Sequence, residues 1–295
     1  MPDMVPILLD TDIGSDIDDA VALSYLLRQP RCELLGITTV TGDAAQRAAC
    51  AEVLCRAAGR EDVPIHCGAS KPLLYGPGQP HVPQYKALGS HPHRTDWPAN
   101  TAVEFLRQTI RSRPGEIILL TIGPYTNAAL LFALDPEIPS LLKRLVSMAG
   151  VFYADPLYSE WNCKVDSVAT AMVYAANAPA HLSVGLDVTL PCRMATGEVR
   201  ERFKPSPLDI TLEMAEVWFQ NTDAITFHDP LAAALIFHPE LCTYETGRIE
   251  ALVDPDHAKG GITRFALSSA ADAPHTVAKT VDTGAFFDAF FSVFV

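Results

Sequence analysis

Five aspartates stand within the ten residues Asp10-Thr11-Asp12-Ile13-Gly14-Ser15-Asp16-Ile17-Asp18-Asp19. The apolar run from Val5 to Leu9 precedes them, and apolar residues at helical spacing follow from Ala20 to Leu27. We therefore expect the aspartates to lie where a buried strand ends and a helix begins.

Carboxylates packed this densely repel one another and raise each other's pKa values. Helix capping or solvation in a turn explains one or two of the five, because a helix N-terminus uses only one or two capping residues. Oxygen-rich carboxylate sites suit hard cations such as Ca²⁺ or Mg²⁺, which would neutralise the cluster. The cluster is therefore predicted to be a metal site.

The composition is ordinary for a globular protein, with 48% hydrophobic and 19% charged residues. A formal charge of -13 and the lack of a basic run argue against nucleic-acid binding. Seven cysteines without a CxxC pair are predicted to be reduced, mostly buried thiols. No apolar run approaches the roughly 18 residues of a membrane span, and no signal peptide is recognisable. We expect a cytoplasmic protein with no membrane partner.

Strand-like and helix-like segments alternate along the chain. Such alternation implies parallel strands with helices on both faces, so we expect a single α/β domain over residues 1–295, with one open, mostly parallel, Rossmann-like sheet. The expected strands are Val5–Leu9, Glu33–Val40, Val63–Cys67, Ile117–Leu120, Leu145–Ala149 and His181–Gly185. The expected helices are Ala20–Leu27, Ala44–Ala58, Thr101–Arg113, Asn127–Leu134, Ser167–Asn177, Leu208–Gln220 and Pro230–Phe237. Residues 71–100, rich in Pro, Gly and His, are expected to form a mobile active-site loop.

Ligands of open α/β sheets bind beyond the carboxyl ends of the strands, which indicates where partners of the aspartates lie. Four segments combine apolar with polar or glycine residues at such positions: Thr38 to Asp43, Thr121 to Asn127, Ser159 to Asn162 and Phe227 to Pro230. Each has an ordinary alternative, with Asp43 as a helix cap, Glu160 as a surface charge or His228 as a packed polar residue. Because all four are expected at one sheet edge, we interpret them as one site.

These segments resemble the signature of the nucleoside hydrolases of the inosine-uridine preferring type. The matching motifs come in the family's order over nearly the whole chain: Asp10-Thr11-Asp12-Ile13-Gly14, Asp18-Asp19-Ala20, Thr38 to Gly42, Gly123-Pro124-Tyr125-Thr126-Asn127, Glu160-Trp161-Asn162, Val184-Gly185-Leu186-Asp187 and His228-Asp229-Pro230. The resemblance implies calcium-dependent hydrolysis of the N-glycosidic bond of ribonucleosides, giving free ribose and the nucleobase for purine or pyrimidine salvage. We also expect a homodimer or homotetramer.

The resemblance also implies roles for the residues that match. The Ca²⁺ ligands would be Asp12, Asp19, the backbone carbonyl of Ile122, and Asp229. The ribose-binding residues would be Asp18, Glu160 and Asn162, with Asp43 at the place of a family asparagine. Asp10 would orient the site without binding the metal.

The chemistry of these residues agrees with those roles. Calcium accepts six to eight oxygens, which leaves room for water and two sugar hydroxyls. A bound cation lowers the pKa of its water, and Asp12 would take the proton. Attack on C1′ passes through an oxocarbenium-like transition state that the surrounding carboxylates stabilise. His228 would protonate the departing base, since the ordinary pKa of histidine lies near neutrality. The acidity of the pocket favours a neutral nucleoside over a nucleotide.

Three features depart from the family pattern. Two residues are inserted between Gly14 and Asp18, and they add Asp16, which has no assigned role. Asp43 stands where asparagine is usual, which removes two hydrogen-bond donors and adds a charge. The long loop carries His81, His91 and His93, which could contact the base or remain in solvent. The base preference therefore stays open.

Other classes share part of the pattern. A metal-dependent phosphatase of the haloacid-dehalogenase type also begins with a strand and Asp-x-Asp, but it would have Thr or Val in place of Gly14. An EF-hand would need its closing glutamate at the position of Val21, and helices on both flanks. A non-catalytic nucleoside- or sugar-binding protein on the same fold remains an alternative, because binding and catalysis use most of the same residues.

Overall fold

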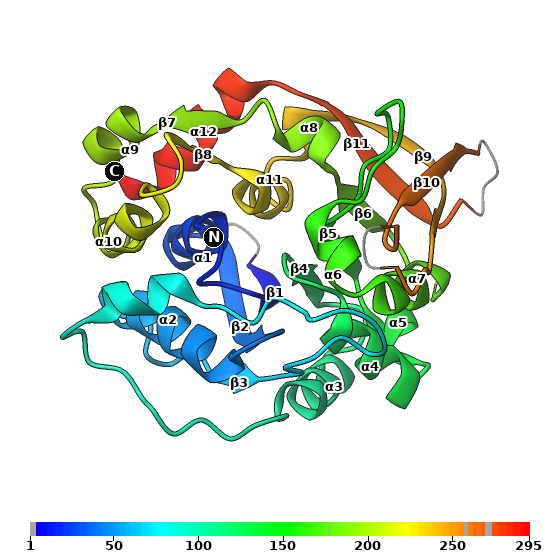
Figure 1. The fold of residues 1–295 in the computed structure, drawn as a ribbon, viewed down its shortest axis with the longest axis horizontal. Helices are drawn as coiled ribbons and strands as arrows, with labels where there is room; N and C mark the ends of the chain where they lie inside the picture. Colours follow the sequence, from blue (N-terminus) through cyan, green and yellow to red (C-terminus); the bar gives the residue numbers. More distant parts are fainter. Residues whose placement is uncertain (1–3, 177, 257–258, 269–272) are drawn as a thin grey trace.

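The computed structural model describes residues 4–176, 178–256, 259–268 and 273–295. One open sheet of nine strands runs through it in the order β10-β9-β11-β6-β5-β4-β1-β2-β3 (Figure 1). The strands are β1 Val5–Thr11, β2 Cys32–Thr39, β3 Ile65–Cys67, β4 Ile118–Thr121, β5 Arg144–Met148, β6 His181–Val184, β9 Cys242–Ala251, β10 Thr263–Leu267 and β11 His275–Val281. All neighbours from β3 to β11 pair in parallel, whereas β9 and β10 join antiparallel. The mostly parallel open sheet is the predicted fold class.

Helices cover both faces of the sheet (Figure 1). They are α1 Asp18–Arg28, α2 Ala44–Ala57, α3 Ala102–Ser112, α4 Thr126–Leu134, α5 Ile138–Leu141, α6 Trp161–Val165, α7 Ser167–Ala175, α8 Leu186–Thr189, α9 Thr196–Arg202, α10 Leu208–Trp218, α11 His228–Ala234 and α12 Thr283–Phe291. Strand β1 shows why two layers form. Ile7 and Leu9 pack in one apolar cluster with α1, α2 and α11, while Leu8 packs in a second with α3, α4 and α7. Because side chains alternate across a strand, a continuous apolar run needs cover on both faces.

The predicted elements are found at nearly their expected places. Strand β1 continues past Leu9 to Thr11, so Asp10 lies inside the strand. Helix α7 begins at Ser167 as predicted, whereas the predicted end at Asn177 lies outside the described residues. Residues 71–100 contain a short 3₁₀ helix, Pro83–Leu88, in the predicted irregular loop. The seven cysteines are buried and free, as expected.

The main elements that the sequence did not predict lie between residue 193 and the C-terminus. Strands β9, β10 and β11 extend the sheet, and β7 Arg193–Ala195 pairs with β8 Ala224–Thr226 in a separate antiparallel ribbon. Helix α12 then packs its phenylalanines, including Phe286 and Phe290, against Phe227. Within the described ranges, none of the helices has the length and apolar character needed to cross a lipid bilayer.

Candidate active site

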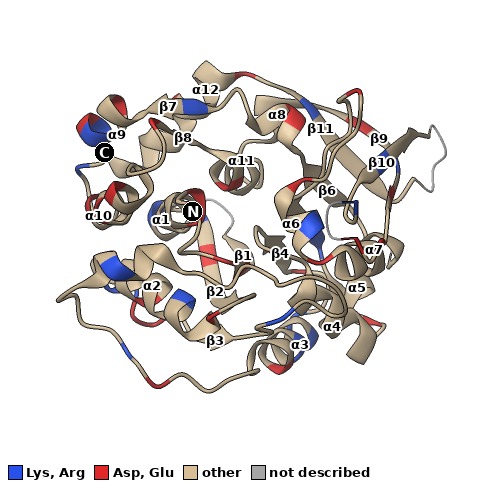
Figure 2. Cartoon of the chain, viewed as in Figure 1, with Lys and Arg blue, Asp and Glu red and all other residues tan. Residues whose placement is uncertain are grey.

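A cavity of about 460 Å³ lies at the carboxyl ends of β1, β4, β5 and β6. Acidic residues in the loop after β1, at the start of α1 and in the first turn of α11 line it, and Figure 2 marks the acidic positions along the ribbon in red. Most of the residues predicted for the site line this cavity: Asp12, Asp18, Asp19, Ile122, Glu160, Asn162, His228 and Asp229. Residues up to 217 positions apart in sequence are thus brought together at one sheet edge, where α/β folds bind ligands.

Asp10 lies behind the cavity, within the sheet. Its Oδ1 accepts hydrogen bonds from the Thr38 hydroxyl and, at 2.7 Å, from the Asn127 amide. Among the described residues, its Oδ2 has no hydrogen-bond partner. Burial raises the pKa of Asp10 to about 7. Its place between strands and away from the cavity wall suits a residue that orients the loop after β1.

Four buried carboxylates converge at the base of the cavity. Oxygens of Asp18, Asp19 and Asp229 lie within 4.8 Å of one another, and Asp12 lines the same cavity. Burial raises the pKa of each, and repulsion from the neighbouring carboxylates adds to the rise for Asp18, Asp19 and Asp229. In the described chain, Lys and Arg form no ion pair with any of the four.

This donor set fits a hard divalent cation. Buried carboxylates that have raised pKa values and form no ion pair with Lys or Arg are stabilised when a cation replaces their protons. All donors are oxygens, which Ca²⁺ and Mg²⁺ prefer. The compact trio includes Asp18, which sequence analysis placed on the ribose, and excludes Asp12 at that separation. Asp18 is therefore close enough to share a cation with Asp19 and Asp229.

Ile122 follows β4 directly and lines the same cavity, to which it brings a backbone carbonyl. This carbonyl accepts a 2.9 Å hydrogen bond from the Asn162 amide, which also donates to the Met148 carbonyl at 3.1 Å. A carbonyl oxygen has two lone pairs, so the Ile122 oxygen retains one for a cation. The Asn162 side chain is thus held in place by the ends of β4 and β5.

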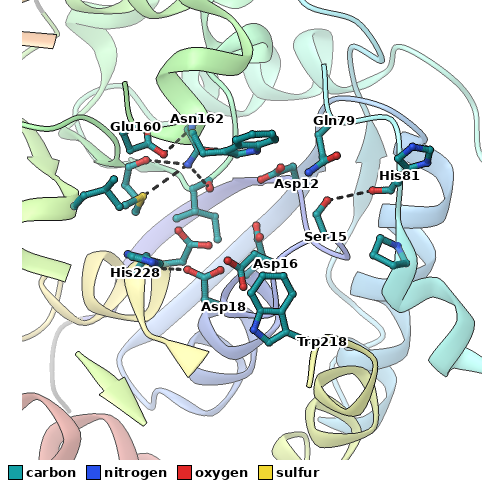
Figure 3. Close-up of a pocket in the computed structure, with 17 residues that line it drawn as sticks. Asp12, Ser15, Asp16, Asp18, Gln79, His81, Glu160, Asn162, Trp218 and His228 are labelled. Atoms are coloured by element: carbon teal, nitrogen blue, oxygen red, sulfur yellow. Dashed lines mark hydrogen bonds between the residues drawn. The ribbon is translucent and has the colours of Figure 1, made fainter. Parts of the chain in front are cut away.

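Glu160 is fixed at the N-terminus of α6. Its carboxylate accepts hydrogen bonds from the backbone amides of Asn162 at 2.6 Å and Cys163 at 3.0 Å. Burial raises the pKa of Glu160, and these amide donors oppose the rise. Figure 3 shows Glu160 and Asn162 on one side of the cavity, with Asp16 and Asp18 across from them.

His228 begins α11, next to Asp229. Its Nδ1 lies 2.6 Å from the hydroxyl oxygen of Thr189. Burial lowers the pKa of His228 to about 4. The expectation that its pKa lies near neutrality is therefore wrong for the free protein, because desolvation disfavours the imidazolium. At neutral pH the ring is uncharged and offers one donor and one acceptor nitrogen.

Several cavity residues were not assigned in advance. Trp218 at the end of α10 and Leu186 at the start of α8 form apolar parts of the wall. Trp161, whose exposed fraction is 47%, also lines the cavity. Its position between Glu160 and Asn162 was the one available signal. Helical periodicity does not distinguish Trp218 from a core residue, so its place follows only from packing.

The inserted Asp16 also lines the cavity (Figure 3). Its Oδ1 accepts a 2.6 Å hydrogen bond from the amide of Ile17, and burial raises its pKa to about 6. His81 lines the cavity as well. By contrast, His91 binds Glu213 at 2.8 Å and His93 lies 2.7 Å from the His91 carbonyl oxygen, and neither lines the cavity.

Asp43 does not reach the site. Its exposed side chain accepts a 3.0 Å hydrogen bond from the Gln46 amide and so caps α2. It borders a separate surface hollow and is not part of the cavity wall. The ordinary alternative, a helix cap, describes its position in this structure.

Comparison with known proteins gives one consistent result. Residues 7–288 match the family profile of the inosine-uridine preferring nucleoside hydrolases. The chain is 30% identical over 262 residues to uridine nucleosidase 1 of Arabidopsis thaliana, covering 82% of this chain and 76% of that protein. It is 30% identical over 259 residues to the pyrimidine-specific ribonucleoside hydrolase RihA of Klebsiella pneumoniae, covering 81% of each.

Solved structures show the same fold. A plant nucleoside hydrolase superposes with a TM-score of 0.84 at 23% identity, over 98% of both chains. A purine-preferring ribonucleoside hydrolase from Gardnerella vaginalis superposes with a TM-score of 0.83, also at 23% identity and over 98% of both chains.

Proposed function

This chain belongs to the inosine-uridine preferring nucleoside hydrolase family, whose members act on N-glycosyl bonds, and we propose that it hydrolyses ribonucleosides to free ribose and nucleobase in a Ca²⁺-dependent reaction. One observation carries the proposal. The buried carboxylates of Asp12, Asp18, Asp19 and Asp229 share a cavity with Glu160 and Asn162. Such a cavity combines oxygen ligands for a cation with acceptors for sugar hydroxyls.

The metal would be held by Asp12, Asp19, Asp229 and the carbonyl oxygen of Ile122. Asp18 would lie next to these ligands. A hard divalent cation bound there would lower the pKa of a water molecule and bind sugar hydroxyls. We favour Ca²⁺ over Mg²⁺ because carbonyl and carboxylate donors from several segments suit its higher and more flexible coordination.

Asp12 would serve as the general base. It would take one proton from water while the water oxygen forms a bond to C1′ of the ribose and the bond from C1′ to the base nitrogen breaks. The base would leave with that electron pair and take up a proton from solvent, and Asp12 would release its proton to solvent. The transition state carries positive charge on the sugar ring. Asp18 and Glu160 stabilise that charge, and together with Asn162 they bind the sugar hydroxyls. Asp10 orients the loop that carries Asp12.

His228 would assist departure of the base. We propose that the Thr189 hydroxyl donates to Nδ1, since their separation is 2.6 Å. Nε2 then carries the hydrogen. A neutral imidazole in this tautomer donates a hydrogen bond to the nitrogen or oxygen on which the leaving base gathers charge. The lowered pKa of His228 favours this hydrogen-bond role at neutral pH over the transfer of a stored proton.

The apolar wall supplies a surface for the base. Trp161, Trp218 and Leu186 line the cavity together with the carboxylates. Aromatic side chains stack on any nucleobase, because every base has a π-face, whatever polar groups it carries at its edges. The relatives are named for uridine and pyrimidine ribonucleosides, so we propose uridine as the first substrate to test.

The setting of the reaction is also part of the proposal. Free base and ribose are products that a cell can reuse, which supports a role in purine or pyrimidine salvage in the cytoplasm. A homodimer or homotetramer is the proposed assembly, and light scattering coupled to size-exclusion chromatography measures it.

Release of free ribose from a panel of ribonucleosides, with and without Ca²⁺, tests the proposed hydrolysis. Binding without release would instead identify a nucleoside-binding protein.

A further inference from the structure

We propose that Arg47 is a positioning residue that fastens one wall of the cavity, residues 79–84, to the aspartate loop, residues 12–19. The segment 79–84 belongs to the long irregular stretch that sequence analysis expected to be mobile. Gln79, His81 and Pro83 from this segment line the cavity. The shape of the cavity therefore depends on whether this segment is held in one conformation.

Arg47 lies on α2 and is fully buried. Its Nε donates to the Thr41 carbonyl at 2.8 Å. Its Nη1 donates to the carbonyl of Asp12, to the carbonyl of Ile13 at 3.0 Å and to the Ser15 hydroxyl at 2.8 Å. Its Nη2 donates to the Gln79 carbonyl at 2.9 Å. One side chain thus joins three separate parts of the chain.

The two segments also contact each other directly. The backbone amide of Gln84 donates to the Gly14 carbonyl at 3.1 Å, and its side-chain amide donates to the Ser15 carbonyl at 3.1 Å. The Ser15 hydroxyl, which accepts from Arg47, donates to the His81 carbonyl at 3.3 Å. Ser15 therefore links the aspartate loop to both Arg47 and the 79–84 segment.

The turn before α2 completes the attachment. The Gln79 amide donates to the Thr41 hydroxyl at 2.9 Å. A Cβ atom at Gly42 would lie 2.1 Å from the Gln79 carbonyl oxygen, and Gly42 has a φ of +63°. Only glycine allows the 79–84 segment to approach this closely without strain. The close approach of Gly42 to Gln79 and the hydrogen bonds of the Arg47 guanidinium together indicate that the 79–84 segment is held in place.

The chemistry of arginine suits this position. A buried guanidinium is costly unless its N–H groups are hydrogen-bonded. Here the acceptors are neutral oxygens, and the positive charge also opposes the rise in the pKa values of Asp12 and Asp19. A lysine would keep the charge but not the planar fork that spans several acceptors.

Hydrogen–deuterium exchange on the full protein, without substrate, tests the proposal. We expect Arg47→Met to speed exchange of the amides of Gln79 and Gln84 about tenfold or more, because their protection depends on closure of this wall. Arg47→Lys should resemble Arg47→Met more than the wild type. Arg56→Met is the matched control, since Arg56 lies on the same helix but pairs at the surface with Glu52. It should exchange like the wild type at these amides.

Ser15→Ala provides a second, milder variant. It removes one contact of Arg47 and one of His81, so we expect exchange at Gln79 and Gln84 to rise about threefold. If Arg47→Met does not fold, the result for Ser15→Ala decides. Wild-type exchange in the folded Arg47→Met variant, or in Ser15→Ala where Arg47→Met fails, would overturn the proposal.

The consequence for substrate binding rests on the proposed function. A loosened wall should raise KM for the nucleoside about tenfold in Arg47→Met, whereas Arg56→Met should not change it. Exchange is measured without substrate, so the role of Arg47 can be tested independently of the proposed hydrolysis. Faster exchange in a protein that cleaves no nucleoside would support the role of Arg47 and reject the proposed function.

Discussion

The backbone amide of Asp229 donates a 3.1 Å hydrogen bond to the carboxylate of Asp18. This bond joins the first turns of α1 and α11, which are 211 residues apart in sequence. Partial positive charge at helix N-termini stabilises nearby carboxylates. The two helix starts therefore hold an acidic cluster together that would otherwise separate by repulsion.

Asp12 is the residue on which the proposed chemistry depends most. We expect Asp12→Asn to lower kcat about 10²- to 10⁴-fold, because the amide cannot take the proton from water. Asp16→Asn is the matched control, since Asp16 lines the same cavity but has no assigned role in proton transfer. Steady-state kinetics on uridine compares the two. A kcat of Asp12→Asn close to that of the wild type would remove Asp12 as the base.

Asp43 tests the distinction between the site and its surroundings. Since it caps α2 outside the cavity wall and asparagine caps helices as well as aspartate, Asp43→Asn should keep kcat/KM within about twofold. Asp43→Ala should lower the free energy of unfolding by about 1 kcal/mol with the same small effect on kcat/KM. Denaturant titration and kinetics separate these effects. A large loss of activity in Asp43→Asn would indicate that Asp43 contacts the substrate after all.

His228 is expected to matter only when the leaving base needs help. His228→Ala should lower kcat about 10²-fold or more on nucleosides, because the hydrogen bond to the base is lost. On a 4-nitrophenyl riboside, whose leaving group is stable as an anion, the loss should be small. Thr189→Val should show a weaker form of the same pattern, since Thr189 sets the tautomer of His228. Equal losses on both substrates would argue against this role.

The raised pKa values predict an unusual dependence of stability on pH. Burial raises the pKa of Asp10 to about 7 and that of Asp16 to about 6. Between about pH 4 and pH 7 the folded state keeps protons that the unfolded state has released, so the metal-free protein loses stability as pH rises. Thermal unfolding in the presence of a chelator measures this slope.

Ca²⁺ should reverse that loss. The ion binds the ionised carboxylates of the folded state, so the rise in Tm on adding Ca²⁺ should be larger at pH 8 than at pH 5. Asp229→Asn, which removes one carboxylate from the compact trio, should show a smaller rise. A Ca²⁺ effect that does not depend on pH or on Asp229 would contradict the proposed metal site.

Much of the fold was predictable because local signals and the global pattern agree. The apolar run of β1, the aspartates after it and the apolar spacing of α1 placed the site at a sheet edge without a structure. The strands from Cys242 to Val281 were missed, since their alternating and partly exposed residues give weaker signals than the buried parallel strands.

The site was predictable where function leaves a mark in the local sequence. The motifs that contain Asp12, Glu160 and Asp229 place polar residues after apolar segments, which predicts a binding site at the edge of the sheet. The pKa of His228 was not predictable, because it depends on how completely the fold buries the ring. The position of Asp43 likewise depends on which way a single side chain turns at the start of α2.

Release of free ribose from uridine, inosine and other ribonucleosides, measured with a chelator and again after adding Ca²⁺, tests the central claim most directly. We predict that at least one nucleoside yields ribose and free base in equal amounts, that the chelator abolishes the reaction and that Ca²⁺ restores it. Nucleoside binding without release of ribose, or release that persists in the chelator, would contradict the account.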